Sequence, residues 1–141
     1  MKLKNLSKIN FIKDTDTVAG FSVSMPFKQK IIPYLDKLDK VSKKTNSVNT
    51  VKVIKNKFFG FNTDYYGVHE ILRKYKIKNN KSILLLGNGG MANTIRILLK
   101  DLKFNNINYS SRNKKRYNNW DIKKNDIIDW NKRGHIKKYD L

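Results

Sequence analysis

The feature that most constrains this chain is a glycine-rich turn between a short apolar run and an amphipathic segment. Ile83–Leu86 is continuously apolar, as expected of a strand buried in a parallel sheet. Three glycines follow it closely: Gly87, Gly89 and Gly90. Apolar residues then recur at helical spacing: Ile95, Leu98, Leu99 and Leu102. With Ile107–Ser110 as a second strand, the order of elements predicts one βαβ unit of an α/β fold.

The first turn of such a unit is where a dinucleotide pyrophosphate binds. Gly87 would permit the tight turn, and Gly89 would let backbone N–H groups approach the phosphates. The helix that begins near Gly90 would direct the positive end of its dipole at them. The candidate cofactor contacts in this stretch are Gly87, Asn88, Gly89, Gly90, Met91 and Ala92. The alternative is a glycine turn that joins strand to helix without any ligand.

The second predicted strand leads into a basic segment that carries hydroxyl groups. An NAD site commonly has an acidic residue about 20 positions after the glycines, whereas an NADP site has an arginine. Here the candidates are Ser111, Arg112, Asn113 and Arg116, with no carboxylate among residues 110–116. Arginine and serine can both donate to a 2′-phosphate. The segment therefore favours NADP over NAD; a solvated basic cluster is the alternative, above all for Arg116.

The formal charge of +20 on 141 residues is the most unusual global property. Such a charge favours anionic ligands and could attract nucleic acid through phosphate contacts. The positive residues follow no single motif, however. We therefore expect a composition bias spread over exposed positions, and no specific nucleic-acid partner.

Several classes of site and location are disfavoured by what the sequence lacks. There is no cysteine, which excludes disulfides and thiolate metal sites. His69 and His135 are isolated, so no metal site is predicted. No apolar run approaches the roughly 20 residues that span a bilayer, and the N-terminus lacks the apolar core of a secretory signal. We expect a cytoplasmic protein with no membrane partner.

The first half of the chain is predicted to form a second α/β unit. The expected strands are residues 18–24, 48–54 and 58–61, and the expected helices are residues 1–12, 27–32, 34–44 and 63–75. Pro26 has a backbone angle suited to the first turn of a helix, which puts Lys28 just beyond a strand end, where α/β sheets meet ligands. The short polar segment at residues 76–80 predicts a boundary between domains at 1–76 and 77–141.

Several motifs, in this order, resemble those of the shikimate dehydrogenase family. GFSVSMPFK at residues 20–28 resembles the family's G-x-N-V-T-x-P-x-K motif, and SVNT at residues 47–50 resembles its A-x-N-T element. GFNTDYYG at residues 60–67 is similar to G-x-N-T-D-x-x-G. The glycine turn is similar to G-x-G-G-A-[AS], and residues 111–116 to the N-R-T-x-x-R cluster that binds the NADP 2′-phosphate.

This resemblance implies a partial substrate-binding α/β domain followed by the first half of a Rossmann NADP-binding domain. It implies an NADP-dependent oxidoreductase that reversibly reduces 3-dehydroshikimate to shikimate in aromatic amino-acid biosynthesis. Lys28 and Asp64 would be the catalytic pair, with the ammonium stabilising the developing alkoxide and the carboxylate orienting the ammonium. Ser22, Ser24 and Asn49 would bind the substrate.

The sequence also departs from the family's pattern. Ser22 and Ser24 stand where the family has Asn and Thr. An initial strand and helix with a serine pair for the substrate carboxylate, and strands and a helix beyond Leu141, have no counterpart. We therefore expect a truncated form with low independent activity and self-association through an incomplete sheet. The alternatives are a noncatalytic remnant that binds nucleotides or polyanions, and a quinate-type dehydrogenase for another cyclic hydroxy acid.

Overall fold

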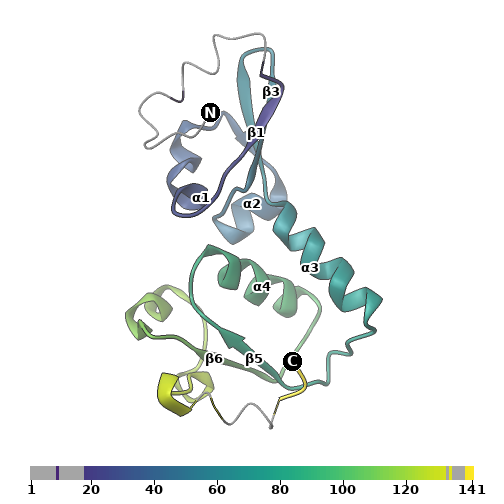
Figure 1. Cartoon of the computed structure of the whole chain (residues 1–141), viewed down its shortest axis with the longest axis vertical. Helices are drawn as coiled ribbons and strands as arrows, with labels where there is room; N and C mark the ends of the chain where they lie inside the picture. The colour runs from purple at the N-terminus through teal and green to yellow at the C-terminus, as the bar shows by residue number, and fades with distance from the viewer. Residues whose placement is uncertain (1–8, 10–17, 133, 135–138) are drawn as a thin grey trace. The chain divides into compact units, whose positions relative to one another are not determined.

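The computed structural model describes Ile9, residues 18–132, Gly134 and residues 139–141. The chain divides into two compact units, Met1–Tyr66 and Gly67–Leu141, here called the N-terminal and C-terminal units (Figure 1). The division falls within helix α3 (Thr63–Lys74), the helix expected at residues 63–75. The helix expected at residues 1–12 lies outside the described residues, apart from Ile9.

The N-terminal unit is built on a four-stranded sheet of order β1-β3-β4-β2. Its strands are β1 (Gly20–Ser22), β2 (Lys37–Leu38), β3 (Thr50–Ile54) and β4 (Lys57–Phe61). β3 and β4, the strands expected at residues 48–54 and 58–61, pair as an antiparallel hairpin. Its two turn residues, Lys55 and Asn56, have φ angles of 47° and 56°, which suit the twist of a two-residue hairpin.

One apolar cluster holds this unit together. Its buried members are Ile9, Val23, Ile31, Val48, Val51 and Phe58. Phe58 is fully buried on β4 and meets the Phe21 ring edge-on, with ring centroids 5.6 Å apart. The next residue, Phe59, is half-buried, because successive side chains on a strand point to opposite faces.

Of the helix expected at residues 34–44, only residues 40–44 are confirmed as α-helical. The helix α1 (Phe27–Lys30) gives way to a 3-10 turn, η2 (Ile32–Tyr34), then to β2 and the short helix α2 (Lys40–Thr45). Asp36 keeps the chain extended, because its backbone N–H donates to the Phe58 carbonyl at 3.0 Å and its carboxylate accepts from the Phe58 N–H at 2.7 Å. Asp39 then caps α2 by accepting from the Ser42 N–H at 2.7 Å.

The C-terminal unit confirms the predicted βαβ order. β5 (Ile83–Leu86) and β6 (Ile107–Ser110) pair in parallel, and α4 (Gly90–Asp101) connects them. Of the predicted apolar positions on this helix, Leu98 and Leu99 are buried, whereas Ile95 and Leu102 are half-buried. On α3, Leu72 is buried, whereas Ile71 is more than half exposed.

Two further segments flank this pair of strands. The Ile128 N–H donates to the Tyr109 carbonyl at 2.8 Å, next to a parallel bridge between Tyr109 and Ile127. On the other edge, the Leu84 N–H donates to the Leu141 carbonyl at 2.8 Å. The order Ile127, β6, β5, Leu141 matches the first four positions, 3-2-1-4, of a doubly wound dinucleotide-binding sheet.

The buried ring of Tyr109 predicts a pH dependence of stability. Burial raises its pKa to about 12, although the Arg96 guanidinium favours the phenolate. An ordinary tyrosine ionises near 10, so the folded state binds this proton more tightly than the unfolded chain. The resulting stability, about 2–3 kcal/mol, is present below pH 10 and is lost as the pH rises to 12. Urea unfolding at pH 9–12 should therefore show a steeper alkaline loss for the natural chain than for Tyr109→Phe; equal losses would refute the raised pKa.

Candidate functional site

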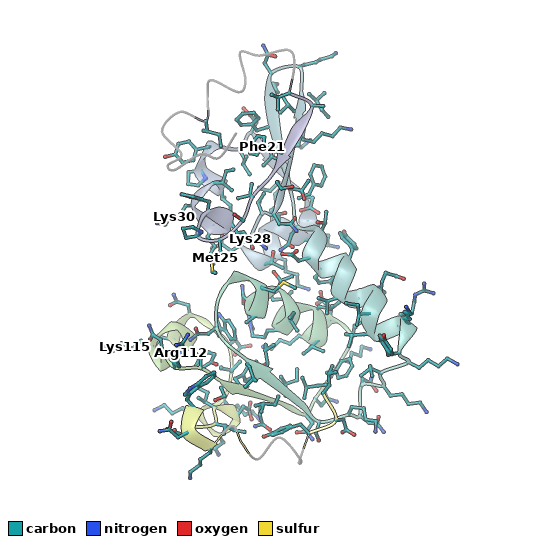
Figure 2. The ribbon with its side chains drawn as sticks, viewed as in Figure 1. Phe21, Met25, Lys28, Lys30, Arg112 and Lys115 are labelled. Carbon is teal, nitrogen blue, oxygen red and sulfur yellow. The ribbon has the colours of Figure 1, made fainter. Side chains whose placement is uncertain are left out.

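The predicted pair of Lys28 and Asp64 is assembled by two elements of the N-terminal unit. Lys28 lies in α1, and its carbonyl accepts from the Val48 N–H at 2.8 Å. Asp64 lies in the first turn of α3. Figure 2 shows the position of Lys28. The Lys28 Nζ and Asp64 Oδ2 atoms are 2.7 Å apart, and the two side chains are 22% and 23% exposed. The pair is thus both fixed and open to a small ligand.

Asn49 holds the other oxygen of the same carboxylate. Its Oδ1 accepts from the backbone N–H of Thr63 at 2.9 Å, which fixes the orientation of the carboxamide. Its Nδ2 therefore faces Asp64 and donates to Oδ1 at 2.7 Å. Asn49 was predicted as a substrate contact, and the structure adds that it clamps the carboxylate.

Two threonines that the sequence analysis did not assign to the site support this clamp. The Thr50 hydroxyl donates to Asn49 Oδ1 at 3.0 Å. The Thr63 hydroxyl lies 2.9 Å from Asn49 Nδ2 and 3.2 Å from its Oδ1. Each threonine directly adjoins a predicted site residue in the sequence, Asn49 or Asp64. That adjacency was the signal that could have found them.

Ser22 and Ser24 lie beside this cluster. Ser22 is paired with Thr50 in the register of β1 and β3. Between the two serines, the Val23 N–H donates to the Asn49 carbonyl at 2.7 Å. Both serines are exposed. The structure therefore brings all five predicted substrate-side residues to one end of the N-terminal sheet.

The glycine turn of the C-terminal unit joins β5 to α4. Gly87 has a φ of +103°, which L side chains rarely adopt. Gly89 is extended ahead of α4, and a Cβ placed on it would meet no atom within 4 Å. The first turn of α4 has neither an acidic residue nor a side-chain cap. Met91 is exposed, whereas Ala92 is buried and serves helix packing.

The basic segment after β6 lies against this turn. Ser111 is buried, whereas Arg112 and Asn113 are exposed (Figure 2). The Asn88 side chain donates to the Asn113 carbonyl, and the Gly87 N–H donates to the Ser110 carbonyl at 2.8 Å. The backbone of Arg116 belongs to the 3-10 helix η3 (Lys114–Asn119), but its side chain lies outside the described residues. The predicted phosphate turn and the predicted 2′-phosphate segment are therefore neighbours.

The described residues contain neither a cluster that could hold a metal ion nor a membrane-spanning helix. In that part of the chain, no three side chains of the metal-binding types come together. Likewise, none of the helices described is long and apolar enough to cross a membrane.

Sequence comparison places the chain among known proteins. Residues 2–51 match the family of the shikimate dehydrogenase substrate binding domain. The NADP(+) shikimate dehydrogenase of Clostridium botulinum strain Hall is 35% identical over 140 residues, 99% of this chain and 52% of that protein. Almost the whole chain is therefore similar to proteins of the shikimate dehydrogenase family. It spans about half the length of the curated relatives it matches.

Solved structures of the shikimate dehydrogenase family agree with the fold. The chorismate mutase/shikimate 5-dehydrogenase fusion protein of Clostridium acetobutylicum superposes with a TM-score of 0.81 at 26% identity, covering 96% of this chain and 51% of that one. The shikimate 5-dehydrogenase of Thermus thermophilus, in complex with NADP(H) and shikimate, gives a TM-score of 0.71 at 25% identity, covering 82% and 44%. The predicted fold class, a substrate-binding α/β domain followed by a Rossmann-type half, is confirmed.

Proposed function

We propose that this chain carries the active-site residues of an NADP-dependent shikimate dehydrogenase, which reversibly reduces 3-dehydroshikimate to shikimate. The observation that carries the proposal is the Lys28–Asp64 pair, 2.7 Å apart, with Asn49 bonded to the second carboxylate oxygen. The names of the relatives, and the relative solved with NADP(H) and shikimate, support the same substrate and cofactor.

The chemistry of ketone reduction explains these residue types. Negative charge develops on the ketone oxygen, and an ammonium at Lys28 can stabilise that charge and supply the proton. The carboxylate of Asp64 holds the ammonium in place and can accept a hydrogen bond from a substrate hydroxyl. The exposed hydroxyls of Ser22 and Ser24 are suited to the remaining hydroxyls of the ring. A quinate-type substrate would use the same groups.

The C-terminal unit fits NADP in its donor groups. When bound in its reduced form, NADPH, the cofactor would supply the hydride. Gly87 forms the turn with its positive φ, and Gly89, which has no side chain, leaves the N-terminus of α4 open, where the helix dipole favours the pyrophosphate. Ser111, Arg112 and Asn113 follow β6 with no carboxylate among them, and we keep Arg116 as a fourth contact. A 2′-phosphate would find cationic and hydroxyl donors there.

Replacing Arg112 tests the cofactor directly. We expect Arg112→Ala to raise the Kd for NADPH about 10- to 100-fold, because a hydrogen bond to a charged group is lost, and to change that for NADH about twofold at most. Lys115→Ala is the matched control, since it removes one positive charge from the same exposed segment (Figure 2). Calorimetric titration at two salt concentrations measures both. If the two variants weakened NADPH binding equally, the binding would depend on a basic surface and not on a specific contact from Arg112.

We further propose that these 141 residues by themselves reduce 3-dehydroshikimate slowly, because they span about half the length of the matched relatives. Only short segments flank β5 and β6 among the described residues, which is consistent with self-association through this sheet. The charge of +20 favours one other candidate, a noncatalytic module that binds nucleotides or polyanions. Such a module would keep its affinity without Lys28 and Asp64.

A further inference from the structure

Three hydrogen bonds connect the glycine turn to the last residue of β6 and to the segment that follows it. The Gly87 N–H donates to the Ser110 carbonyl, the Asn88 side chain donates to the Asn113 carbonyl, and the Tyr117 hydroxyl makes a long contact of 3.5 Å to the Gly87 carbonyl. Of these, only the bond from Asn88 reaches the exposed middle of the segment.

The two ends of that segment are anchored by burial. Ser111 is 5% exposed and Tyr117 is 3% exposed. The Tyr117 ring packs against Tyr109 and Trp120, with centroids 6.2 and 5.1 Å away. Burial raises the pKa of Tyr117, so its ring carries no charge at neutral pH.

Between these anchors the chain is held mainly by polar bonds. Asn113 accepts the bond from Asn88 at its carbonyl and caps η3 by accepting from the Lys115 N–H at 3.2 Å. Its own N–H donates to the Ser111 hydroxyl at 3.3 Å. Arg112 therefore lies between Ser111, which is buried, and Asn113, whose carbonyl accepts a hydrogen bond from Asn88. An exposed arginine on a fixed backbone loses less freedom when it binds an anion than one on a mobile backbone.

We propose that Asn88 is a positioning residue for Arg112, and that it sets the preference for a dinucleotide bearing a 2′-phosphate. The side chain acts through the Asn113 carbonyl and not on the ligand. This inference rests on the proposed cofactor. The inference extends the proposed cofactor assignment, because it attributes part of the discrimination between NADPH and NADH to a residue of the glycine turn.

Titration of the 141-residue chain with NADPH and NADH tests the proposal. We expect Asn88→Ala to weaken NADPH binding about fivefold, the usual effect of one lost hydrogen bond, and NADH binding less than twofold. Asn88→Ser, which keeps a shorter donor, should fall between. Asn80→Ala, in the exposed turn ahead of β5, is the control and should change neither affinity. If Asn88 bound the pyrophosphate or merely stabilised the fold, both dinucleotides would weaken equally.

A double-variant cycle separates this inference from the cofactor assignment. In a chain that already carries Arg112→Ala, Asn88→Ala should leave the ratio of the two affinities unchanged, because the group it positions is gone. A further drop in that ratio would overturn the positioning role alone. A natural chain that binds NADPH no better than NADH would overturn the cofactor assignment, and with it this inference.

A second measurement requires no ligand. Amide hydrogen exchange at residues 112–115 should accelerate in Asn88→Ala, while amides of β5 and β6 stay protected and report that the unit is folded. Unchanged exchange at residues 112–115 would overturn the proposal.

Discussion

Replacing Lys28 with methionine is expected to lower the NADPH-dependent reduction of 3-dehydroshikimate about 10²- to 10⁴-fold. Methionine keeps most of the side-chain volume but removes the ammonium that stabilises and protonates the alkoxide. The affinity for NADPH should stay within about twofold, since Lys28 lies in the N-terminal unit and the glycine turn in the C-terminal unit. Single-turnover assays with excess protein, with shikimate detected by mass spectrometry, suit the low turnover expected of these 141 residues.

Two further variants make this test specific. Lys30→Met is the matched control, because Lys30 is an exposed lysine at the end of the same helix. Its turnover should stay near that of the natural chain. Asp64→Asn should reduce turnover as strongly as Lys28→Met. The double variant should be little worse than either, because two residues that act as a unit are not additive. Turnover that survives in both single variants would favour the noncatalytic alternative.

Replacing Phe58 with alanine is expected to destabilise the N-terminal unit by about 3–5 kcal/mol. The side chain is fully buried, meets the Phe21 ring edge-on and belongs to the apolar cluster described for this unit. Removing an aromatic ring from such a site loses its transfer free energy and leaves a cavity. Whole-protein stabilities are about 5–15 kcal/mol, so much of the unit's stability would be lost. Amide exchange in β3 and β4 measures the effect.

The neighbouring residue supplies the control. Phe59 lies on the same strand but is only half-buried, on the opposite face. Phe59→Ala should therefore destabilise the unit by less than half as much. Amides of β5 and β6, in the C-terminal unit, should keep their protection in both variants. Equal losses from Phe58→Ala and Phe59→Ala would contradict the one-sided core.

The sequence by itself determined the elements whose signals are local. The apolar run at Ile83–Leu86, the glycines and the periodic leucines predicted β5, the turn and α4, because hydrophobic period and backbone freedom are properties of neighbouring residues. The same holds for the hairpin of β3 and β4. The ordered motifs also predicted the similarity to shikimate dehydrogenases and the residues that the N-terminal sheet brings together.

Only the tertiary structure decided which polar groups meet. Lys28 and Asp64 are 36 positions apart in the chain, and the orientation of the Asn49 carboxamide follows from a backbone N–H that the sequence does not place. Residues 35–39 did not form the expected helix, because Asp36 bonds to a strand 22 positions away. The bond from Asn88 to Asn113 spans 25 positions. Hydrogen-bond partners at such separations are chosen by packing, which no local pattern records.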